Sequence, residues 1–442
     1  MKRIQTLDIL RGVAMLGLVF MHAFEKVGHN SVIAQIFTYP WYLFFPLGLL
    51  FYFASWRGFF LIISGAGNAY GFQKAVENGK SPHILLLRRL LWSTVLFFHG
   101  IFIQVFWNPY GGLYNVFQGV TGPGIWNLSF LQWSDAVETI AIGIFISSII
   151  HYILILGKIR NKPWIPIIVF GVLTILIFTL TPYLTQTVLQ KFGWTSIKQI
   201  QYQTVNNFAD RLRWLSLALL IGEQQPLFPY LASSFLGSGI GIALTDRNIT
   251  KKRAVMTGFV LGGFFIVFGV LLGGLLENFV VGISIIPNRW FLILGTGIQV
   301  WVLTVFLWIF DFSKKAKHLT NYTKTIRKAG ILSLTIFTLQ SFDFFPRWLL
   351  TKISADWGGG VDYITNSGWL EIGNAFLTAF AVLIFWIIFI NHWGLVNFTL
   401  SFDWLFEIFR RGTSGEKINW KDPMRSREII HNAEIVFDRK PT

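Results

Sequence analysis

The chain has 442 residues, of which 53% are hydrophobic and only 13% are charged. A soluble domain carries about 25% charged residues, so this composition excludes an ordinary soluble protein and indicates one that crosses a membrane several times. A net charge of +16 would favour nucleic-acid binding in a soluble chain, but the positive-inside rule accounts for it here and no nucleic-acid partner is expected. The chain has no cysteine, which excludes a disulfide framework, a thiolate metal site and a cysteine acyl-enzyme.

Long apolar runs recur along the sequence, and each is about as long as the hydrocarbon core of a bilayer requires. They predict an all-α, polytopic membrane bundle of about ten transmembrane helices. The predicted spans lie near residues 6–26, 55–77, 84–107, 134–157, 164–183, 212–245, 254–276, 288–312, 329–352 and 369–392. The sixth is expected to be a broken helix, because Pro226 closes a polar stretch that begins at Gly222.

The distribution of Lys and Arg predicts the orientation of these spans. With the N-terminus in the cytoplasm, most basic residues fall in cytoplasmic connections, as the positive-inside rule requires. Residues 33–54 are also apolar, but a further span there would move every later basic segment outside, so a re-entrant or interfacial segment is expected. Residues 1–410 are expected to form the membrane domain and 411–442 a polar cytoplasmic tail, with both termini cytoplasmic. The outer segments 108–133 and 184–211 are expected to be loops that cover an acceptor site.

The first predicted span carries an arginine near one end and a histidine near the other. Arg11 and His22 are eleven residues apart. At about 100° per residue they share one face of the helix, separated by about 16 Å. Ionisable groups inside a membrane span are costly and usually functional. The spacing therefore predicts a cation toward one membrane surface and a titratable imidazole toward the other.

This first span resembles that of the transmembrane acyltransferases related to heparan-α-glucosaminide N-acetyltransferase. Those proteins open with an Arg, a Leu-Asp pair and an Arg-Gly before an apolar run that ends in Asn or His, as residues 3–22 do. Residues 57–67, 226–237 and 333–341 are similar to further segments of the family, the last of them to its YeiB-type branch. That branch ends on a Gly-Pro-Leu-Glu-Trp-like stretch, where this chain lacks the proline and has Asp403 in place of the glutamate.

The resemblance implies a cell-membrane enzyme that takes an acyl group from cytosolic acyl-coenzyme A, in particular acetyl-coenzyme A. The acceptor would be an amine or hydroxyl of an extracytoplasmic sugar or glycolipid. The lipid bilayer is the other expected partner, and the sequence leaves both a monomer and a homo-oligomer open. An alternative from another class is a secondary transporter or flippase, which the broken sixth span and Glu223 favour. A third is an inactive scaffold of the same fold.

Three residues are candidates for catalysis: His22, Asp343 and His99. His22 is predicted to act as general base, because a neutral imidazole can take the proton of an attacking hydroxyl or amine. The alternative is a structural histidine that bonds to a neighbouring helix, and this alternative also applies to His99. Asp343 is predicted to pair with His22 or with Arg57.

The candidates for substrate binding near the outer surface are Arg57, Asp135 and Gln340. Arg57 can instead form an ion pair with an acid of another helix. Asp135, with Glu138, can instead be an acid that the helix dipole favours at a helix N-terminus.

The candidates for binding the phosphates of coenzyme A are Arg11, Arg88 and Arg89. Arg11 can instead neutralise Asp8, one turn before it. Arg88 and Arg89 can instead anchor their helix among lipid headgroups. No spacing of ligands predicts a metal site.

Overall fold

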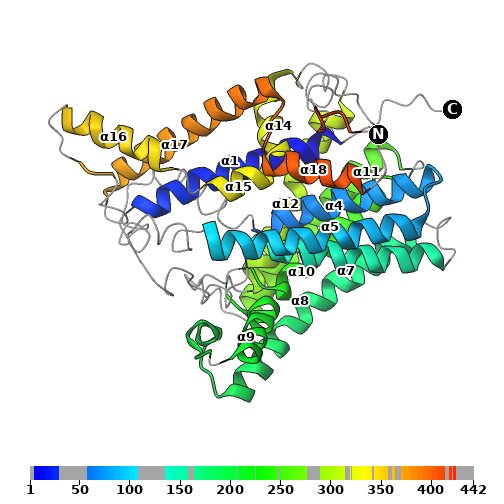
Figure 1. Cartoon of the computed structure of the whole chain (residues 1–442). Helices are drawn as coiled ribbons and strands as arrows, with labels where there is room; N and C mark the ends of the chain where they lie inside the picture. The colour runs from blue at the N-terminus through cyan, green and yellow to red at the C-terminus, as the bar shows by residue number, and fades with distance from the viewer. Residues whose placement is uncertain are drawn as a thin grey trace. The chain divides into compact units, whose positions relative to one another are not determined.

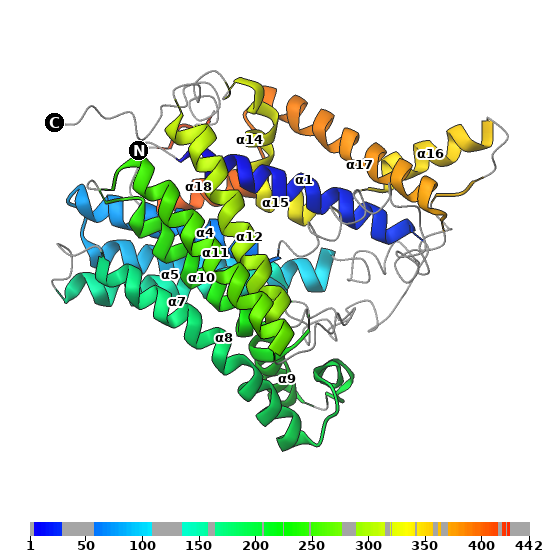
Figure 2. The same cartoon turned by 180° about the vertical axis from the view of Figure 1, so that it is seen from behind.

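A computed structural model gives the arrangement of the chain (Figures 1 and 2). It describes residues 4–28, 57–107, 135–157, 164–205, 207–223, 225–246, 249–275, 289–313, 319, 321–340, 343–356, 361–363, 370–413, 418–420 and 422–424. Within these ranges the regular structure is helical, as predicted, without a β-strand and with one isolated bridge between Gly28 and Leu370. The chain folds as two compact units: unit 1 comprises 1–56 and 309–442, and unit 2 comprises 57–308.

Seven helices of the described ranges are long and apolar enough to cross a bilayer. They are α1 (Gln5–Val27), α5 (Pro82–Phe102) with the π-helical turn η2 (Ile103–Trp107), α7 (Ala136–Leu156), α8 (Trp164–Phe192), α11 (Lys251–Leu275), α12 (Arg289–Leu307) with the π-helical turn η7 (Trp308–Phe312), and α17 (Ile372–Trp393) with the 3-10 turn η8 (Gly394–Val396). These helices have the length and composition of a multi-pass membrane protein.

Two further predicted spans are helical but fall outside this set. The span predicted at 55–77 is the continuous helix α4 (Arg57–Glu77), which is less apolar because it includes polar residues such as Asn68 and Gln73. The span predicted at 212–245 is two helices, α9 (Phe208–Ile221) and α10 (Leu227–Ala243). They separate at the predicted interruption, where Pro226 precedes the first residue of α10. With 17 residues, α10 is shorter than a typical membrane-spanning helix.

The span predicted at 329–352 is wrong as a single helix. The structure has three short helices there: α14 (Lys324–Ile331), α15 (Ser333–Leu339) and α16 (Phe344–Asp356). Leu332, between the first two, leaves the helical conformation with φ −91° and ψ 20°. Hydropathy does not detect such a break, because the residues on both sides of it are apolar.

The outer segment predicted as a loop at 184–211 is also largely helical. α8 continues to Phe192 and is followed by the 3-10 helix η6 (Ile197–Tyr202). Between Pro182 and Gly193 no proline or glycine interrupts the chain, so the helix runs on to that glycine. Gly193 then adopts φ +65°, the left-handed conformation that commonly ends helices.

In unit 1, α1 packs against α14 and α17 (Figures 1 and 2). The crossing with α14 is close because each helix presents a glycine. A Cβ atom at Gly12 would overlap the carbonyl of Ile326, and one at Gly330 would overlap the carbonyl of Asp8. Small residues allow helix backbones to approach in this way in membrane proteins. Against α17, α1 packs through phenylalanine rings.

In unit 2, α10 is the central helix and packs against α4, α7 and α8. α5 pairs with α7, and α11 pairs with α12. Polar side chains in this core bond between helices: the hydroxyls of Ser147 and Ser234 are 3.4 Å apart, and Thr174 donates to the carbonyl of Ala232 at 3.3 Å. The core of unit 2 therefore contains hydrogen bonds between helices as well as apolar packing.

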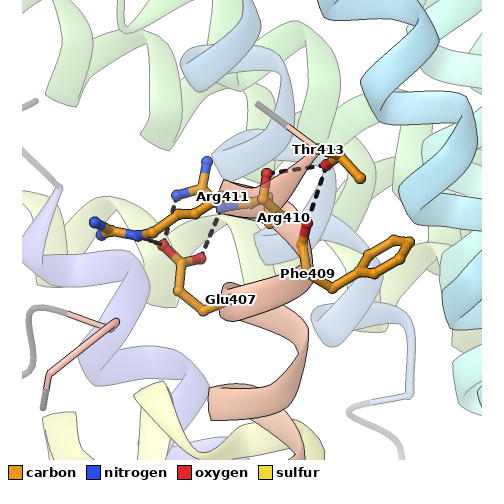
Figure 3. A network of polar contacts seen from close by, with 5 residues as sticks. All are labelled: Glu407, Phe409, Arg410, Arg411 and Thr413. Atoms are coloured by element: carbon orange, nitrogen blue, oxygen red, sulfur yellow. Dashed lines mark hydrogen bonds and ion pairs between the residues drawn. The ribbon is translucent and has the colours of Figure 1, made fainter. Parts of the chain in front are cut away.

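The last helix of the described residues is the amphipathic helix α18 (Phe402–Gly412). Glu407 accepts two hydrogen bonds from Arg410 and one, of 2.8 Å, from Arg411 (Figure 3). Because the helix ends at Gly412, the boundary predicted after residue 410 falls inside its last turn. The segments predicted at 33–54 and 108–133 and most of the tail lie outside the described residues.

Candidate functional site

The last turns of α1 meet the segment that joins α15 to α16, all within unit 1. His22 Nδ1 lies 2.9 Å from Gln340 Oε1. One turn further along α1, Lys26 Nζ lies 3.2 Å from Asp343 Oδ2, in an ion pair. Two polar contacts thus join the same two segments side by side. The structure brings together three of the predicted site residues: His22, Gln340 and Asp343.

The contact with Gln340 fits the tautomer of neutral His22 that carries its proton on Nδ1. The amide oxygen of Gln340 only accepts hydrogen bonds, so Nδ1 of the neutral ring is the donor. Nε2 then carries the lone pair, which is the form a general base requires. His22 is half-buried on α1. Gln340, predicted to bind substrate, therefore contacts the predicted base, whereas Asp343 forms its ion pair with Lys26.

The other end of α1 is a cluster of charged residues. Arg11 forms an ion pair with Asp8 across 3.9 Å, as the structural alternative predicts. Arg327 of α14 is 1% exposed. Burial lowers the pKa of Arg327, and the negative charge of Asp8 opposes this shift. This end of α1 therefore brings together side chains of both charges.

Two further carboxylates at this end of α1 accept hydrogen bonds from the N-termini of helices. Asp311 accepts hydrogen bonds from the backbone N–H groups of Gln5 and Thr6, at 3.1 and 2.9 Å, and so caps α1 from a distant part of the sequence. Asp403 of α18 accepts from the backbone N–H of Thr335, at 2.9 Å, and from its hydroxyl, at 2.7 Å. Burial raises the pKa of Asp403 to about 6, although these hydrogen bonds and the charge of Arg11 favour the ionised form.

Arg88 and Arg89 lie on α5 in unit 2, and both are half-buried. Arg89 reaches α4, because a Cβ atom at Gly71 would lie 3.1 Å from its Nη2 atom. Its charge also acts on His151 of α7, whose Nε2 lies 3.0 Å from Gln73 Oε1. His151 was not among the predicted site residues. Sequence reasoning passed over it because a single histidine in an apolar helix gives no sign of its partner.

His99 and Asp135 lie in unit 2, on the facing helices α5 and α7. His99 is 9% exposed, and the next residue, Gly100, faces Glu138 of α7. Asp135 caps α7 by accepting a hydrogen bond of 2.6 Å from Ala136 N, so its predicted structural alternative holds. Glu138, for which the sequence offered the alternative of a helix N-terminal acid, is 1% exposed.

The remaining candidates are placed as follows. Arg57 begins α4 in unit 2, and its side chain lies outside the described residues. Among the residues that the structure describes, no three His, Asp or Glu side chains gather in a way that could hold a metal ion. The candidate base and its contacts therefore belong to unit 1, and the candidate arginines Arg88 and Arg89 to unit 2.

Comparison with known proteins adds no family to this description: no protein-family model matches the chain, and no curated protein matches it.

Proposed function

We propose that the chain is a membrane-embedded acyltransferase that uses cytosolic acyl-coenzyme A, acetyl-coenzyme A in particular. Its acceptor is an amine or hydroxyl of an extracytoplasmic sugar or glycolipid. The observation that carries the proposal is the contact between His22 Nδ1 and Gln340 Oε1, which leaves Nε2 as the basic nitrogen. The resemblance of residues 3–22 to the acyltransferase family supports the same reading.

The proposed reaction needs no covalent enzyme intermediate. Nε2 of His22 removes the proton from the acceptor hydroxyl or amine as its oxygen or nitrogen attacks the thioester carbonyl carbon. The carbon–sulfur bond then breaks, and the leaving sulfur of coenzyme A takes the proton from the imidazolium. Gln340 acts as a positioning residue. Lys26, which Asp343 holds one turn from His22, is the nearby cation that stabilises negative charge on the carbonyl oxygen.

The proposed donor side is the cytoplasmic side. In unit 2, α4 ends and α5 begins at the same turn, near Arg88 and Arg89, and α11 begins with Lys251 and two further basic residues. Such cations suit the phosphates of coenzyme A. Arg11, on α1 in unit 1, is proposed to bind the innermost phosphate, while its ion pair with Asp8 supports the structural alternative. These assignments go with the proposed topology of about ten spans, a re-entrant segment at 33–54 and cytoplasmic termini.

A second candidate function is a secondary transporter or flippase. The interruption between α9 and α10 favours it, because transporters commonly bind substrates at broken helices. Glu223, which the sequence indicated as the acid of an ion pathway, lies 3.6 Å from Lys198 in an ion pair. The ion pair with Lys198 explains the position of Glu223 without an ion pathway.

The experiment that separates the two functions measures release of coenzyme A. Purified protein in detergent is mixed with acetyl-coenzyme A and an amino sugar such as glucosamine, and a thiol reagent detects the product. The chain has no cysteine, so the protein itself contributes no background. We expect acceptor-dependent release of thiol together with an acetylated sugar. Uptake of sugar into proteoliposomes without any thiol release would instead identify a transporter.

A further inference from the structure

A carboxyl group without a hydrogen-bond partner is buried inside unit 2. Glu138, in the first turn of α7, is 1% exposed. Neither of its carboxyl oxygens has a hydrogen-bond partner among the described residues. The carboxyl packs directly against α5, because a Cβ atom at Gly100 would lie 2.8 Å from Glu138 Cδ. The glycine leaves the space that the carboxyl occupies.

The ionisable groups around Glu138 provide little positive charge. α4, α5 and α10 pack against α7. α5 contributes His99, next to Gly100, and α7 contributes Asp135, which acts on Glu138 as a second carboxyl. The sequence of α10 contains no acidic or basic residue. On α4, the charged residue at the same end of the helix pair is Arg57, whose side chain lies outside the described residues.

Two further buried polar side chains, Gln104 and Gln225, belong to segments next to the α5–α7 contact at Glu138. Gln104 lies one turn beyond Gly100, in the π-helical turn η2, and is 3% exposed with no described partner for Nε2. Gln225 precedes α10, and its carbonyl accepts a hydrogen bond from Thr139, the residue after Glu138. Its Oε1 atom is buried without a described partner as well. π-Helical turns occur frequently at functional sites.

A buried carboxylate is stable only when a cation or several hydrogen bonds compensate for the lost water, and each uncompensated ion costs several kcal/mol. Among the described residues no side chain donates a hydrogen bond to the Glu138 carboxyl or forms an ion pair with it, and the neighbouring carboxyl of Asp135 adds repulsion. The uncharged acid avoids both costs. We propose that Glu138 is a proton-binding site: its carboxyl holds a proton in the resting protein, inside the α5–α7 pair. This proposal does not depend on the acyltransferase reaction.

A protonated Glu138 has a chemical use that a carboxylate lacks. Its O–H group can donate a hydrogen bond or deliver the proton, whereas an ionised carboxyl only accepts. Asp135 is half-buried at the start of α7, one turn from Glu138, and is therefore the acid through which this proton would exchange with the aqueous phase. Ionisable residues inside membrane segments commonly serve in such proton relays.

Infrared spectroscopy of the full chain in detergent tests the proposal, because a protonated carboxylic acid has a carbonyl stretch distinct from that of a carboxylate. The wild type is compared with Glu138→Gln, which keeps the shape of the neutral acid. We expect the variant to fold and to lose the signal of one protonated carboxyl at neutral pH. The matched control is Glu223→Gln, which removes a carboxyl that is ion-paired with Lys198 and should leave the signal unchanged.

Two results would overturn the assignment. The first is an unchanged carboxylic-acid signal in Glu138→Gln, or a failure of that variant to fold while Glu223→Gln folds. The second comes from Arg57→Gln: if Arg57 neutralised an ionised Glu138, its removal would create a new carboxylic-acid signal. The proposal predicts no new signal in Arg57→Gln.

Discussion

At the scale of single residues, Asp403 is expected to make stability depend on pH. Burial raises its pKa to about 6 from a usual value of 3.8. The folded protein therefore binds this proton more tightly than the unfolded chain, so the stabilisation is full below about pH 4 and is lost as the pH rises through about 6. We expect the melting temperature of the wild type to fall across this window and that of Asp403→Asn to fall less.

Glu407 provides the control for this measurement, because it lies on the same helix and shifts in the opposite direction. Burial alone would raise its pKa, but the hydrogen bonds and charges of Arg410 and Arg411 lower it. The stabilisation of the fold by Glu407 is therefore present above the pKa of the unfolded chain and is lost as the pH falls. Glu407→Gln should lower the melting temperature above about pH 4.5, and the difference from the wild type should shrink as the pH falls. Parallel curves for wild type and Asp403→Asn would contradict the assignment.

Gln340 is expected to act through His22. Gln340→Leu removes the acceptor for Nδ1, and the loss of one hydrogen bond predicts a reduction of about tenfold in acyl transfer. Gln340→Glu keeps an acceptor and should restore most of the rate. Its added negative charge should also move the acid limb of the pH–rate profile to higher pH. Equal rates and identical pH profiles in the two variants would show that Gln340 serves only packing.

The spacing of two residues can be predicted from the sequence when both lie on one helix. Arg11 and His22 lie on the continuous helix α1, so their spacing could be calculated from helix geometry. Their partners could not be predicted in this way, because Gln340, which contacts His22, lies 318 residues further along the sequence. Asp343 was expected to pair with His22 or with Arg57, and the structure shows its ion pair with Lys26, one turn from His22. Hydropathy carries no information about such long-range pairs.

At the scale of elements, the glycine contact between α1 and α14 is expected to stabilise unit 1. In Gly330→Ala the added methyl group would overlap the carbonyl of Asp8, and overpacking of this kind costs about 1–3 kcal/mol. We expect a clear fall in melting temperature. The control is Gly373→Ala in the same unit, since a Cβ atom there meets no heavy atom within 4 Å. Similar melting temperatures for the two variants would contradict this packing.

The sequence predicted most of the long helices because their apolar runs are continuous. The prediction from hydropathy was wrong where an apolar stretch is not one continuous helix, or where a helix continues through a polar stretch. The stretch 329–352 is apolar enough for a span, but its backbone breaks at Leu332. Conversely, α8 extends through a polar stretch to Phe192. Local backbone conformation, which hydropathy does not report, decides both cases.

At the scale of the whole molecule, the topology can be tested with single cysteines, because the native chain has none. Lys80, Thr195 and Thr250 are exposed at turns between helices of unit 2. Between Lys80 and Thr195 lie three candidate spans, so the proposed topology puts these two residues on opposite sides. In intact cells an impermeant thiol reagent should label Thr195→Cys and leave Lys80→Cys unlabelled.

Thr250→Cys then decides whether α9 and α10 together cross the membrane. If they cross, position 250 lies in the cytoplasm with position 80 and stays unlabelled. Labelling of Thr250→Cys from outside would show that α10 does not complete a span. Labelling of Lys80→Cys from outside would invert the proposed orientation altogether.

The central claim is that His22 is the base of an acyl transfer, and its most direct test is the rate of acyl transfer by His22→Gln. Loss of a general base costs about 10²–10⁴-fold in rate, so the variant should lose most of its activity while its melting temperature stays close to that of the wild type. The control is His392→Gln, which changes an exposed histidine of α17 whose Nδ1 contacts a backbone carbonyl, and it should transfer at the wild-type rate. A near wild-type rate for a folded His22→Gln protein would contradict the account.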